Sequence, residues 1–345
     1  MTIKNVAERS GVSVSTVSRV LNNHPDVSEA VRARVMRAVK ELHYMPNSSA
    51  RNLVKRQSDA VGVVVRGVQN PFYTDILHAI ERRLDEAGYT MVMHQIPSCD
   101  DEVHCGAVME REKRLRGLIF LGGRSDYTPE DVSTITVPYV CCTYTNNYGT
   151  LPEGDYSSVS IADEAEAARA VKELYTHGHR RIALLTADPA DRSISQLRYL
   201  GYMRALRELG LEAHEEDVIC AKDFAISNAY AAMRERLTRP VEFTAVFAIA
   251  DDMAIGAMRA LRESGRTIPD DCSVIAIDGI SVSEYIHPML STLCQPMRSM
   301  GETSVDILVD IIEGHDGNRH ITLPTTLRTG QSVCAPITGF CAENA

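Results

Sequence analysis

Residues that could do acid, base or metal chemistry are present, but their spacing does not assemble a reactive site. Four possible metal ligands lie where a strand-to-helix loop is expected, at spacings unlike common structural zinc pairs: His94, Cys99, His104 and Cys105. The paired carboxylates at Asp251 and Asp270 mark starts of helices or loops. Ser/His/Asp sets, Cys/His sets and glycine-rich phosphate loops are not evident. We expect no enzymatic activity, metal or cofactor.

A different chemistry is indicated near the N-terminus. Thr2 can cap a first helix, and Gly11 breaks it. A second helix follows, capped by Ser13 or Ser15, in which Val17, Val20 and Leu21 recur at helical spacing. This periodicity leaves a polar and aliphatic face outward, made of Val14, Ser15, Ser18 and Arg19. In a DNA major groove, an arginine can pair with guanine and an aliphatic side chain can contact a thymine methyl group.

A third helix completes the predicted N-terminal domain. Ser28 can cap it, and its inner face is apolar from Val31 to Leu42. Pro46 must end this helix near Tyr44, because the residue before a proline is pushed out of the helical region. The segment after Pro46 is polar and basic, so it should be a linker or a helix that forms only on binding.

Charge is distributed unevenly along the chain. The net charge is −10, but residues 1–58 carry ten Lys and Arg against four Asp and Glu, a local charge of +6. The remaining residues hold 26 Lys and Arg against 42 Asp and Glu, a charge of −16. A basic head can neutralise phosphates, whereas an acidic body would be repelled by them.

Length and composition predict a folded protein of several domains. At 345 residues, with 44% hydrophobic and 24% charged residues, the chain should form two or three domains. No secretory signal or long apolar run is evident, so we expect a cytoplasmic protein with no membrane partner. The nine cysteines are therefore expected to be free thiols.

From Ala60 onward, apolar runs alternate with amphipathic helical patterns, which is typical of parallel α/β sheets. The predicted strands are Val61–Val65, Thr90–His94, Gly117–Leu121, Tyr139–Thr143, Arg181–Thr186, Ala245–Ala248 and Ser273–Ile277. The predicted helices are Tyr73–Ala87, Asp163–His177, Leu197–Leu209, Ile226–Leu237 and Asp251–Ser264. These units are too many for one ordinary doubly wound sheet, so two stacked subdomains are expected.

The segment from Ile3 to Asn22 resembles the head of the LacI/GalR family of bacterial repressors. Further matches, which extend the resemblance to roughly residues 2–335, include Asn70-Pro71-Phe72-Tyr73, Gly178-His179-Arg180-Arg181 and Asp251-Asp252-Met253-Ala254. The resemblance implies a small all-α helix-turn-helix domain plus an α/β core of two doubly wound Rossmann-like subdomains. Such a core is similar to periplasmic binding proteins: the chain crosses between subdomains three times, and a cleft closes over a ligand.

These patterns and the resemblance divide the chain. We expect a helix-turn-helix domain at residues 1–45, a hinge helix at 46–58 and an effector-binding and dimerisation core at 59–340. The first subdomain should contain about residues 59–161 and 291–318, and the second about 162–290 and 319–340. The expected partners are double-stranded palindromic operator DNA, a second copy of the chain and a small-molecule effector.

The expected DNA contacts lie in the head and the hinge. They are Val14, Ser15, Thr16, Ser18, Arg19, Asn22, Ala50, Leu53 and Lys55. By resemblance, Leu53 wedges into the minor groove at the centre of the operator, with Ala50 packing beside it. A simple core contact is the alternative for Leu53.

The resemblance also assigns effector contacts at strand ends, where open α/β sheets bind ligands. They are Phe72, Tyr73, Tyr144, Arg192, Arg198, Phe224, Asp251 and Asp278. Arg198 and Asp278 can bracket adjacent sugar hydroxyls while an aromatic ring stacks on the sugar. Asp251 has an alternative interpretation as an ordinary helix cap.

Two departures from the family pattern leave the ligand class open. Thr143-Tyr144 stand where sugar-binding members often have an acidic residue, and Ala250 stands where an Asn can occur. Arg66 adds a cation that a neutral sugar does not need, so a sugar phosphate or sugar acid is an alternative effector. A purine- or nucleoside-responsive, co-repressed regulator and a transport-type sugar-binding protein are the alternative functions.

Overall fold

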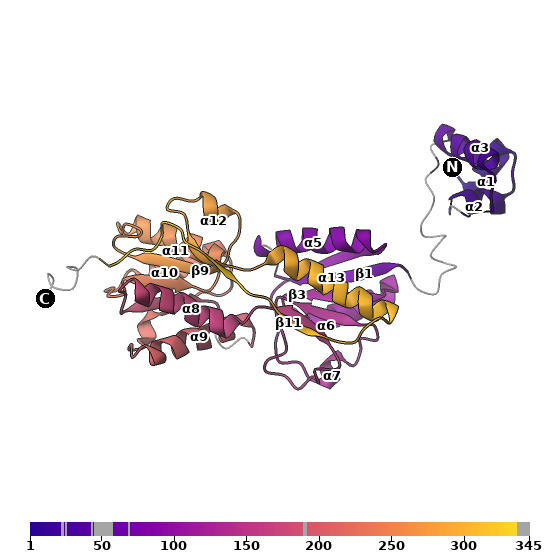
Figure 1. Cartoon of the computed structure of the whole chain (residues 1–345). Helices are drawn as coiled ribbons and strands as arrows, with labels where there is room; N and C mark the ends of the chain where they lie inside the picture. The colour runs from indigo at the N-terminus through magenta and orange to yellow at the C-terminus, as the bar shows by residue number, and fades with distance from the viewer. Residues whose placement is uncertain are drawn as a thin grey trace. The chain divides into compact units, whose positions relative to one another are not determined.

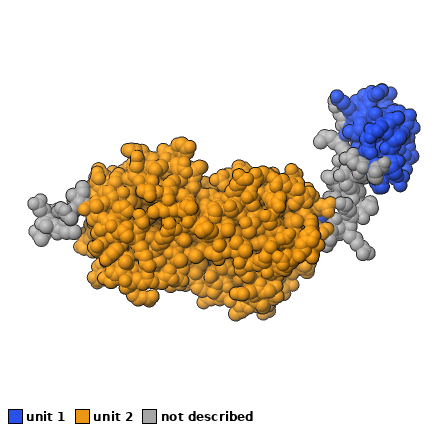
Figure 2. All heavy atoms as spheres, in the orientation of Figure 1, with its two compact units in different colours: residues 1–58 blue, residues 59–345 orange. Residues whose placement is uncertain are grey.

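The computed structural model describes residues 1–21, 24, 26–42, 44, 58–67, 70–188 and 192–336. The chain divides into two units, residues 1–58 and residues 59–345 (Figure 2). The predicted hinge at 46–58 lies, apart from Ser58, outside the described residues.

The first unit contains the three helices that the sequence predicts (Figure 1): α1 (Ile3–Ser10), α2 (Val14–Leu21) and α3 (Glu29–Glu41). Gly11 ends α1 with a φ of 64°, a left-handed conformation that glycine adopts without steric cost. The hydroxyl of Ser13 accepts a hydrogen bond from the backbone N–H of Thr16 at 3.1 Å, so Ser13 caps α2.

The helices of the first unit pack around a small apolar core. Its buried members are Val6, Ala7, Val17, Val20, Val35 and Ala38. Two valines three residues apart, Val17 and Val20, turn one face of α2 inward. The opposite face of α2 is therefore left on the surface.

The second unit contains two sheets of six strands each. The first sheet has the order β11-β5-β4-β3-β1-β2, with parallel pairing throughout. Its strands are β1 (Ala60–Arg66), β2 (Thr90–Ile96), β3 (Gly117–Leu121), β4 (Tyr139–Cys142), β5 (Ser157–Ser160) and β11 (His320–Thr322). Its helices are α5 (Phe72–Glu86), α6 (Glu102–Lys113), α7 (Pro129–Val132) and α13 (Met297–Glu313). Figure 1 shows α5 and α13 side by side.

The second sheet has the order β12-β10-β9-β8-β6-β7, in which β12 pairs antiparallel with β10. Its strands are β6 (Ile182–Thr186), β7 (Val218–Cys220), β8 (Ala245–Ala248), β9 (Ser273–Asp278), β10 (Ser291–Cys294) and β12 (Thr326–Arg328). Its helices are α8 (Asp163–Thr176), α9 (Ile194–Glu208), α10 (Ile226–Arg236), α11 (Asp251–Glu263) and α12 (Val282–Tyr285).

The chain passes between the two sheets three times, after β5, after β10 and after β11. Two of the expected subdomain limits are wrong. β10 continues the ladder of β9 as far as Cys294, opposite Asp278, so residues 291–294 belong to the second subdomain. β11 pairs with β5, so residues 320–322 belong to the first. In both places the backbone hydrogen bonds decide the limit.

The apolar strands and amphipathic helices of the core were predictable, whereas several elements with a weaker signal were missed. β5 consists of Ser157, Ser158, Val159 and Ser160, all buried, and has no apolar run. The start of α6, as far as Cys105, was expected to lie in a strand-to-helix loop, and the rest of the helix was not predicted. It packs on the sheet through small residues, and a methyl group at Gly106 would lie 2.7 Å from the ring of Phe120. β7, α7, α12, β10, α13, β11 and β12 were also not predicted.

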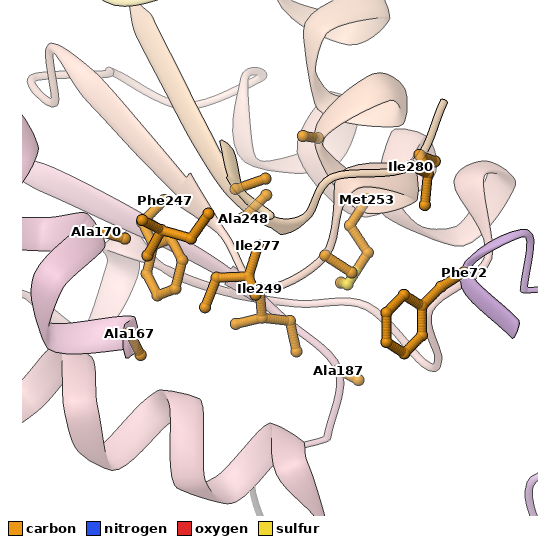
Figure 3. Packing of buried hydrophobic residues seen from close by; sticks show 14 of the residues in the cluster. Phe72, Ala167, Ala170, Ala187, Phe247, Ala248, Ile249, Met253, Ile277 and Ile280 are labelled. Atoms are coloured by element: carbon orange, nitrogen blue, oxygen red, sulfur yellow. The ribbon is translucent and has the colours of Figure 1, made fainter. Parts of the chain in front are cut away.

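The core of the second subdomain is apolar on both sides of its sheet (Figure 3). Phe247 of β8 and Ile277 of β9 are buried, together with Ala167 and Ala170 of α8 and Met253 of α11. Because the strands run parallel, their carboxyl ends meet at the same edge of each sheet. The residues that follow these strands are therefore brought close together.

Candidate DNA-binding surface and effector cavity

The outer face of α2 carries the residues that the sequence assigned to DNA. Val14, Ser15 and Arg19 are exposed, and Thr16 and Ser18 are half-buried. The helix thus presents a short aliphatic, polar and basic surface of the kind that can read a major groove. Four other expected DNA contacts lie outside the described residues: Asn22, Ala50, Leu53 and Lys55.

Arg19 is paired within the head. Its guanidinium lies 3.0 Å from the carboxylate of Asp26, and the Arg19 side chain is 59% exposed. An exposed ion pair contributes only about 0–1 kcal/mol. Asp26 can therefore orient Arg19 on the surface and release it to a base or phosphate at little cost.

A cavity of about 340 Å³ lies between the two subdomains of the second unit. The first subdomain lines it with Arg66, Gly67, Asn70, Phe72, Tyr73, Pro97, Ser98, Gly122, Gly123, Thr143 and Tyr144. The second lines it with Ser193, Ile194, Arg198, Asp223, Phe224, Ala225 and Asp278. Both sets follow strand ends or begin helices, as the register of the sheets requires.

Arg198 and Asp278 form the polar centre of the second-subdomain wall. The guanidinium of the buried Arg198 donates to Asp163 at 2.8 Å and to the carbonyl of Ile249 at 2.5 Å. It also lies 3.5 Å from the carboxylate of Asp278. Gln295 donates a further hydrogen bond to the same carboxylate oxygen. These contacts fix both charged groups before a ligand enters.

Burial governs the protonation of this pair. It raises the pKa of the Asp278 carboxyl, and neighbouring Asp251 adds to the increase, while Arg198 and Gln295 oppose it. Burial likewise raises the pKa of Asp163, again against the effect of Arg198. Asp278 can therefore either accept or donate a hydrogen bond in the cavity near neutral pH, and hydroxyl groups can match both states.

Backbone strain is concentrated at the same place. Thr143 and Asp278 both line the cavity and have positive φ angles, 77° and 139°. Non-glycine residues adopt such conformations only when the surrounding structure holds them, and they are common at ligand sites. Thr143 follows β4 and Asp278 ends β9, so the strained backbone at these two strand ends sets the direction of both side chains.

Aromatic side chains supply the apolar part of the cavity wall. Phe72 and Tyr73 begin α5 with ring centroids 5.6 Å apart, and Tyr144 follows β4. Phe224 lies on the opposite subdomain, before α10. Rings on both walls suit a ligand with apolar faces and a polar rim, such as a sugar.

Arg66, at the end of β1, is a cation in the cavity wall. Its Nε lies 3.5 Å from a carboxylate oxygen of the buried Glu102 and donates to the carbonyl of Asp100 at 3.3 Å. The positive charge that the sequence analysis singled out is therefore paired with a carboxylate in the first subdomain.

Two predicted effector contacts do not line the cavity. Arg192 is exposed, and its carbonyl accepts a hydrogen bond from Ser125. The buried Asp251 accepts hydrogen bonds from two backbone N–H groups and from the hydroxyls of Ser283 and Thr292. Its carboxylate holds the segment after β9 in place. Asp251 is not the N-cap of α11, which is Ala250, so the structure does not show the helix cap of the alternative interpretation either.

Sequence reasoning missed several polar residues around the cavity: Asp163, Ser193, Asp223, Gln295 and Glu102. Asp163 had a usable signal, because it opens a predicted helix after a subdomain crossing. Glu102 had none, since its segment was expected to be a loop.

The structure gives no support to a metal site. His94 lies in β2, and His104 and Cys105 lie in α6 rather than in the expected loop. Within the described parts of the chain, no group of three or more His, Cys, Asp or Glu side chains could hold a metal ion. In the same residues, no helix is long and apolar enough to cross a membrane.

A helix-turn-helix unit and a two-subdomain unit with a polar, aromatic cavity define a class of DNA-binding regulators controlled by small molecules. Residues 2–47 match the family described as "Bacterial regulatory proteins, lacI family", and residues 171–333 match "Periplasmic binding protein-like domain". The chain is 37% identical over 331 residues to the HTH-type transcriptional regulator MalR of Clostridium butyricum, covering 95% of this chain and 97% of the relative.

Two solved structures extend this similarity to the fold. The Lac repressor dimer bound to operator and the anti-inducer ONPF gives a TM-score of 0.79 at 28% identity, over 97% of this chain and 99% of that chain. The complex of the transcriptional regulator CelR with cellobiose gives 0.71 at 33% identity, over 96% and 99%. The chain belongs to the LacI family of bacterial regulatory proteins. It is a DNA-binding transcription regulator and not an enzyme.

Proposed function

We propose that this regulator is a cytoplasmic repressor that binds a palindromic operator as a dimer. Its affinity for the operator decreases or increases when a sugar or sugar derivative enters the cavity. The observation that carries the proposal is the fixed Arg198–Asp278 pair facing aromatic rings across the cavity. The exposed face of α2 supplies the DNA-reading surface.

The proposed effector is a neutral, hydroxylated molecule. Arg198 and Asp278 can bracket adjacent hydroxyls, while Phe72 or Phe224 packs on the ring. The pairing of Arg66 with Glu102 counts against a sugar phosphate or sugar acid. The related CelR structure, which contains cellobiose, supports the same class.

The proposed dimer forms through the second unit. Tyr285 of α12 is 85% exposed and Val282 is 45% exposed, and such large apolar side chains together suit an interface. One helix-turn-helix head makes few phosphate contacts, whereas two heads match a palindrome. The dimer of the related Lac repressor supports this arrangement.

Effector and operator are proposed to be coupled through residues 46–58. A segment this polar needs two partners to stay helical, its dimer mate and the minor groove, with Leu53 as the wedge. Closing the cavity changes the separation of the subdomains to which the two hinges attach. Couplings of this kind commonly amount to about 1–3 kcal/mol.

Operator binding measured with and without sugars tests the proposal. Fluorescence anisotropy with a labelled palindromic operator should show affinity that changes when one sugar of a panel is added. Phe224→Ala should reduce that response and leave operator binding without sugar nearly intact. An affinity that no sugar or nucleoside alters would contradict effector control.

Two other functions were considered from the sequence. A transport-type sugar-binding protein would not carry a helix-turn-helix head, so the first unit argues against it. A nucleoside-responsive, co-repressed regulator would use the same aromatic cavity. The operator assay separates the two, because nucleosides are part of its panel.

A further inference from the structure

Glu102 is a fully buried carboxylate at the start of α6, behind the first-subdomain wall of the cavity. One of its oxygens, Oε1, accepts a hydrogen bond from the backbone N–H of Arg124 at 2.8 Å. The other, Oε2, makes no hydrogen bond that meets the geometric criteria among the described residues and lies 3.5 Å from Nε of Arg66. Burial raises the pKa of this carboxyl, while Arg66 and the hydroxyl of Tyr127 oppose the increase. A buried carboxylate is costly unless it is paired, so Arg66 is the group that balances it.

Arg66 connects this buried charge to the cavity, because its side chain lines the wall. The contacts seen in the structure, to Glu102 and to the carbonyl of Asp100, are both made by Nε. In the described part of the chain, neither terminal guanidinium nitrogen has a hydrogen-bond partner. Since a guanidinium is a planar, rigid fork, anchoring Nε also sets the direction of the two terminal nitrogens.

The charges around the cavity do not favour an anion. Two guanidinium groups, Arg66 and Arg198, line it together with two carboxylates, Asp223 and Asp278. Two further carboxylates lie directly behind the guanidinium groups: Glu102 behind Arg66 and Asp163 beside Arg198. Among the described lining residues, each guanidinium therefore already has a carboxyl partner in the protein.

We propose that Glu102 is a specificity-determining residue that acts through Arg66. It neutralises and orients the Arg66 guanidinium, so that the cavity accepts neutral hydroxylated ligands and discriminates against their anionic counterparts. The inference rests on the proposed effector site and deepens it by naming the residue that sets charge selectivity. From the sequence alone, Arg66 left an anionic effector open as an alternative, because the partner of this cation is 36 positions away in the chain.

The test compares sugars with uronates, in which a carboxylate replaces the hydroxymethyl group. Dissociation constants are measured by isothermal titration calorimetry on the full-length protein at low salt, with glucose and glucuronate, galactose and galacturonate, and cellobiose and cellobiuronate. The variants are Glu102→Gln, Arg66→Gln and, as a matched control, Glu112→Gln, which removes the same charge from an exposed position on the same helix.

The proposal predicts shifts of opposite sign. The wild type should prefer the neutral member of the pair that binds. Glu102→Gln should shift the preference toward the uronate by about tenfold or more, since it leaves the charge of Arg66 unbalanced. Arg66→Gln should shift it further toward the neutral sugar, and Glu112→Gln should leave it unchanged.

Damage to the fold cannot imitate this pattern, because it would weaken both members of a pair together. An unchanged preference in Glu102→Gln, or equal shifts in Glu102→Gln and Glu112→Gln, would overturn the role of Glu102 and leave the sugar effector in place. Should Glu102→Gln not fold, an unchanged or uronate-directed preference in Arg66→Gln overturns it equally. If the wild type binds no member of any pair, the proposed effector class fails, and this inference fails with it.

Discussion

The side-chain amide of Gln295 donates a hydrogen bond of 2.8 Å to the carboxylate of Asp278. Asp278 lines the cavity, and Gln295 follows β10 where the chain passes from the second sheet to the first. A ligand that contacts Asp278 is therefore one hydrogen bond away from a connection between the subdomains.

This contact predicts a loss of coupling in Gln295→Leu. The substitution removes the hydrogen bond while roughly keeping the volume, so the effector should still bind within several-fold of wild type. Its effect on operator affinity should decrease by about 1 kcal/mol or more. Operator titrations with and without the effector measure this. Gln331→Leu, which loses an amide contact to Met289 within the second subdomain, is the control and should keep the full response.

The substitution Asp252→Asn should increase the stability of the fold in a pH-dependent way. Burial, with a further contribution from Asp251, raises the pKa of Asp252 to about 6. The folded state therefore holds this proton more tightly than the unfolded state, and its stability falls as pH rises from about 4 to about 6. Asp252→Asn removes the penalty. Urea denaturation should show the variant about 1–3 kcal/mol more stable than wild type at pH 8, and nearly equal at pH 4. A constant difference at all pH values would contradict this assignment.

A side chain at Gly256 should disturb the packing between α10 and α11. A methyl group there would lie 2.5 Å from the carbonyl oxygen of Ile226 and 2.9 Å from the backbone nitrogen of Tyr230. Because both atoms belong to a backbone, the helices must separate, and Gly256→Ala should cost about 1–3 kcal/mol. Thermal denaturation measures the loss. Gly317→Ala, with no atom within 4 Å of the added methyl group, should be nearly neutral.

Substitutions in the helix-turn-helix domain and in the hinge should cause two different defects in DNA binding. Arg19→Ala should cost about 1–3 kcal/mol of discrimination between operator and mutant sites. Lys55→Ala, expected from the sequence to contact phosphate, should weaken all sites alike and reduce the salt dependence of binding. Titrations of several operator variants at two salt concentrations distinguish these effects. Identical behaviour of the two variants would show that the roles are misassigned.

The fold was predictable where burial leaves a periodic pattern. Val17 and Val20 predicted the inward face of α2, and the apolar strands predicted both sheets. β5 was not predictable, because three serines occupy a buried strand whose stability comes from its neighbours. Local sequence cannot show such a tertiary effect.

The site was predictable only in part. Six of the eight expected effector residues line the cavity, since the carboxyl ends of the strands in a parallel sheet all lie at the same edge. Asp251 is outside the cavity lining, and its hydrogen-bond partners come from β10, α12 and the segment after β9. These partners are distant in the sequence, so the sequence does not reveal them. The Arg66–Glu102 pair was missed for the same reason.

The late strands β11 and β12 have a consequence for how the protein is made. β11 completes the edge of the first sheet and β12 that of the second, and only three residues, 323–325, separate the two strands. During synthesis, the first sheet is complete only when residues 320–322 are available, and the second only when residues 326–328 are available. A chain terminated before residue 320 lacks a strand in both subdomains at once. Such a truncated product would expose two unfinished sheet edges at once, and unpaired strand edges are templates for aggregation.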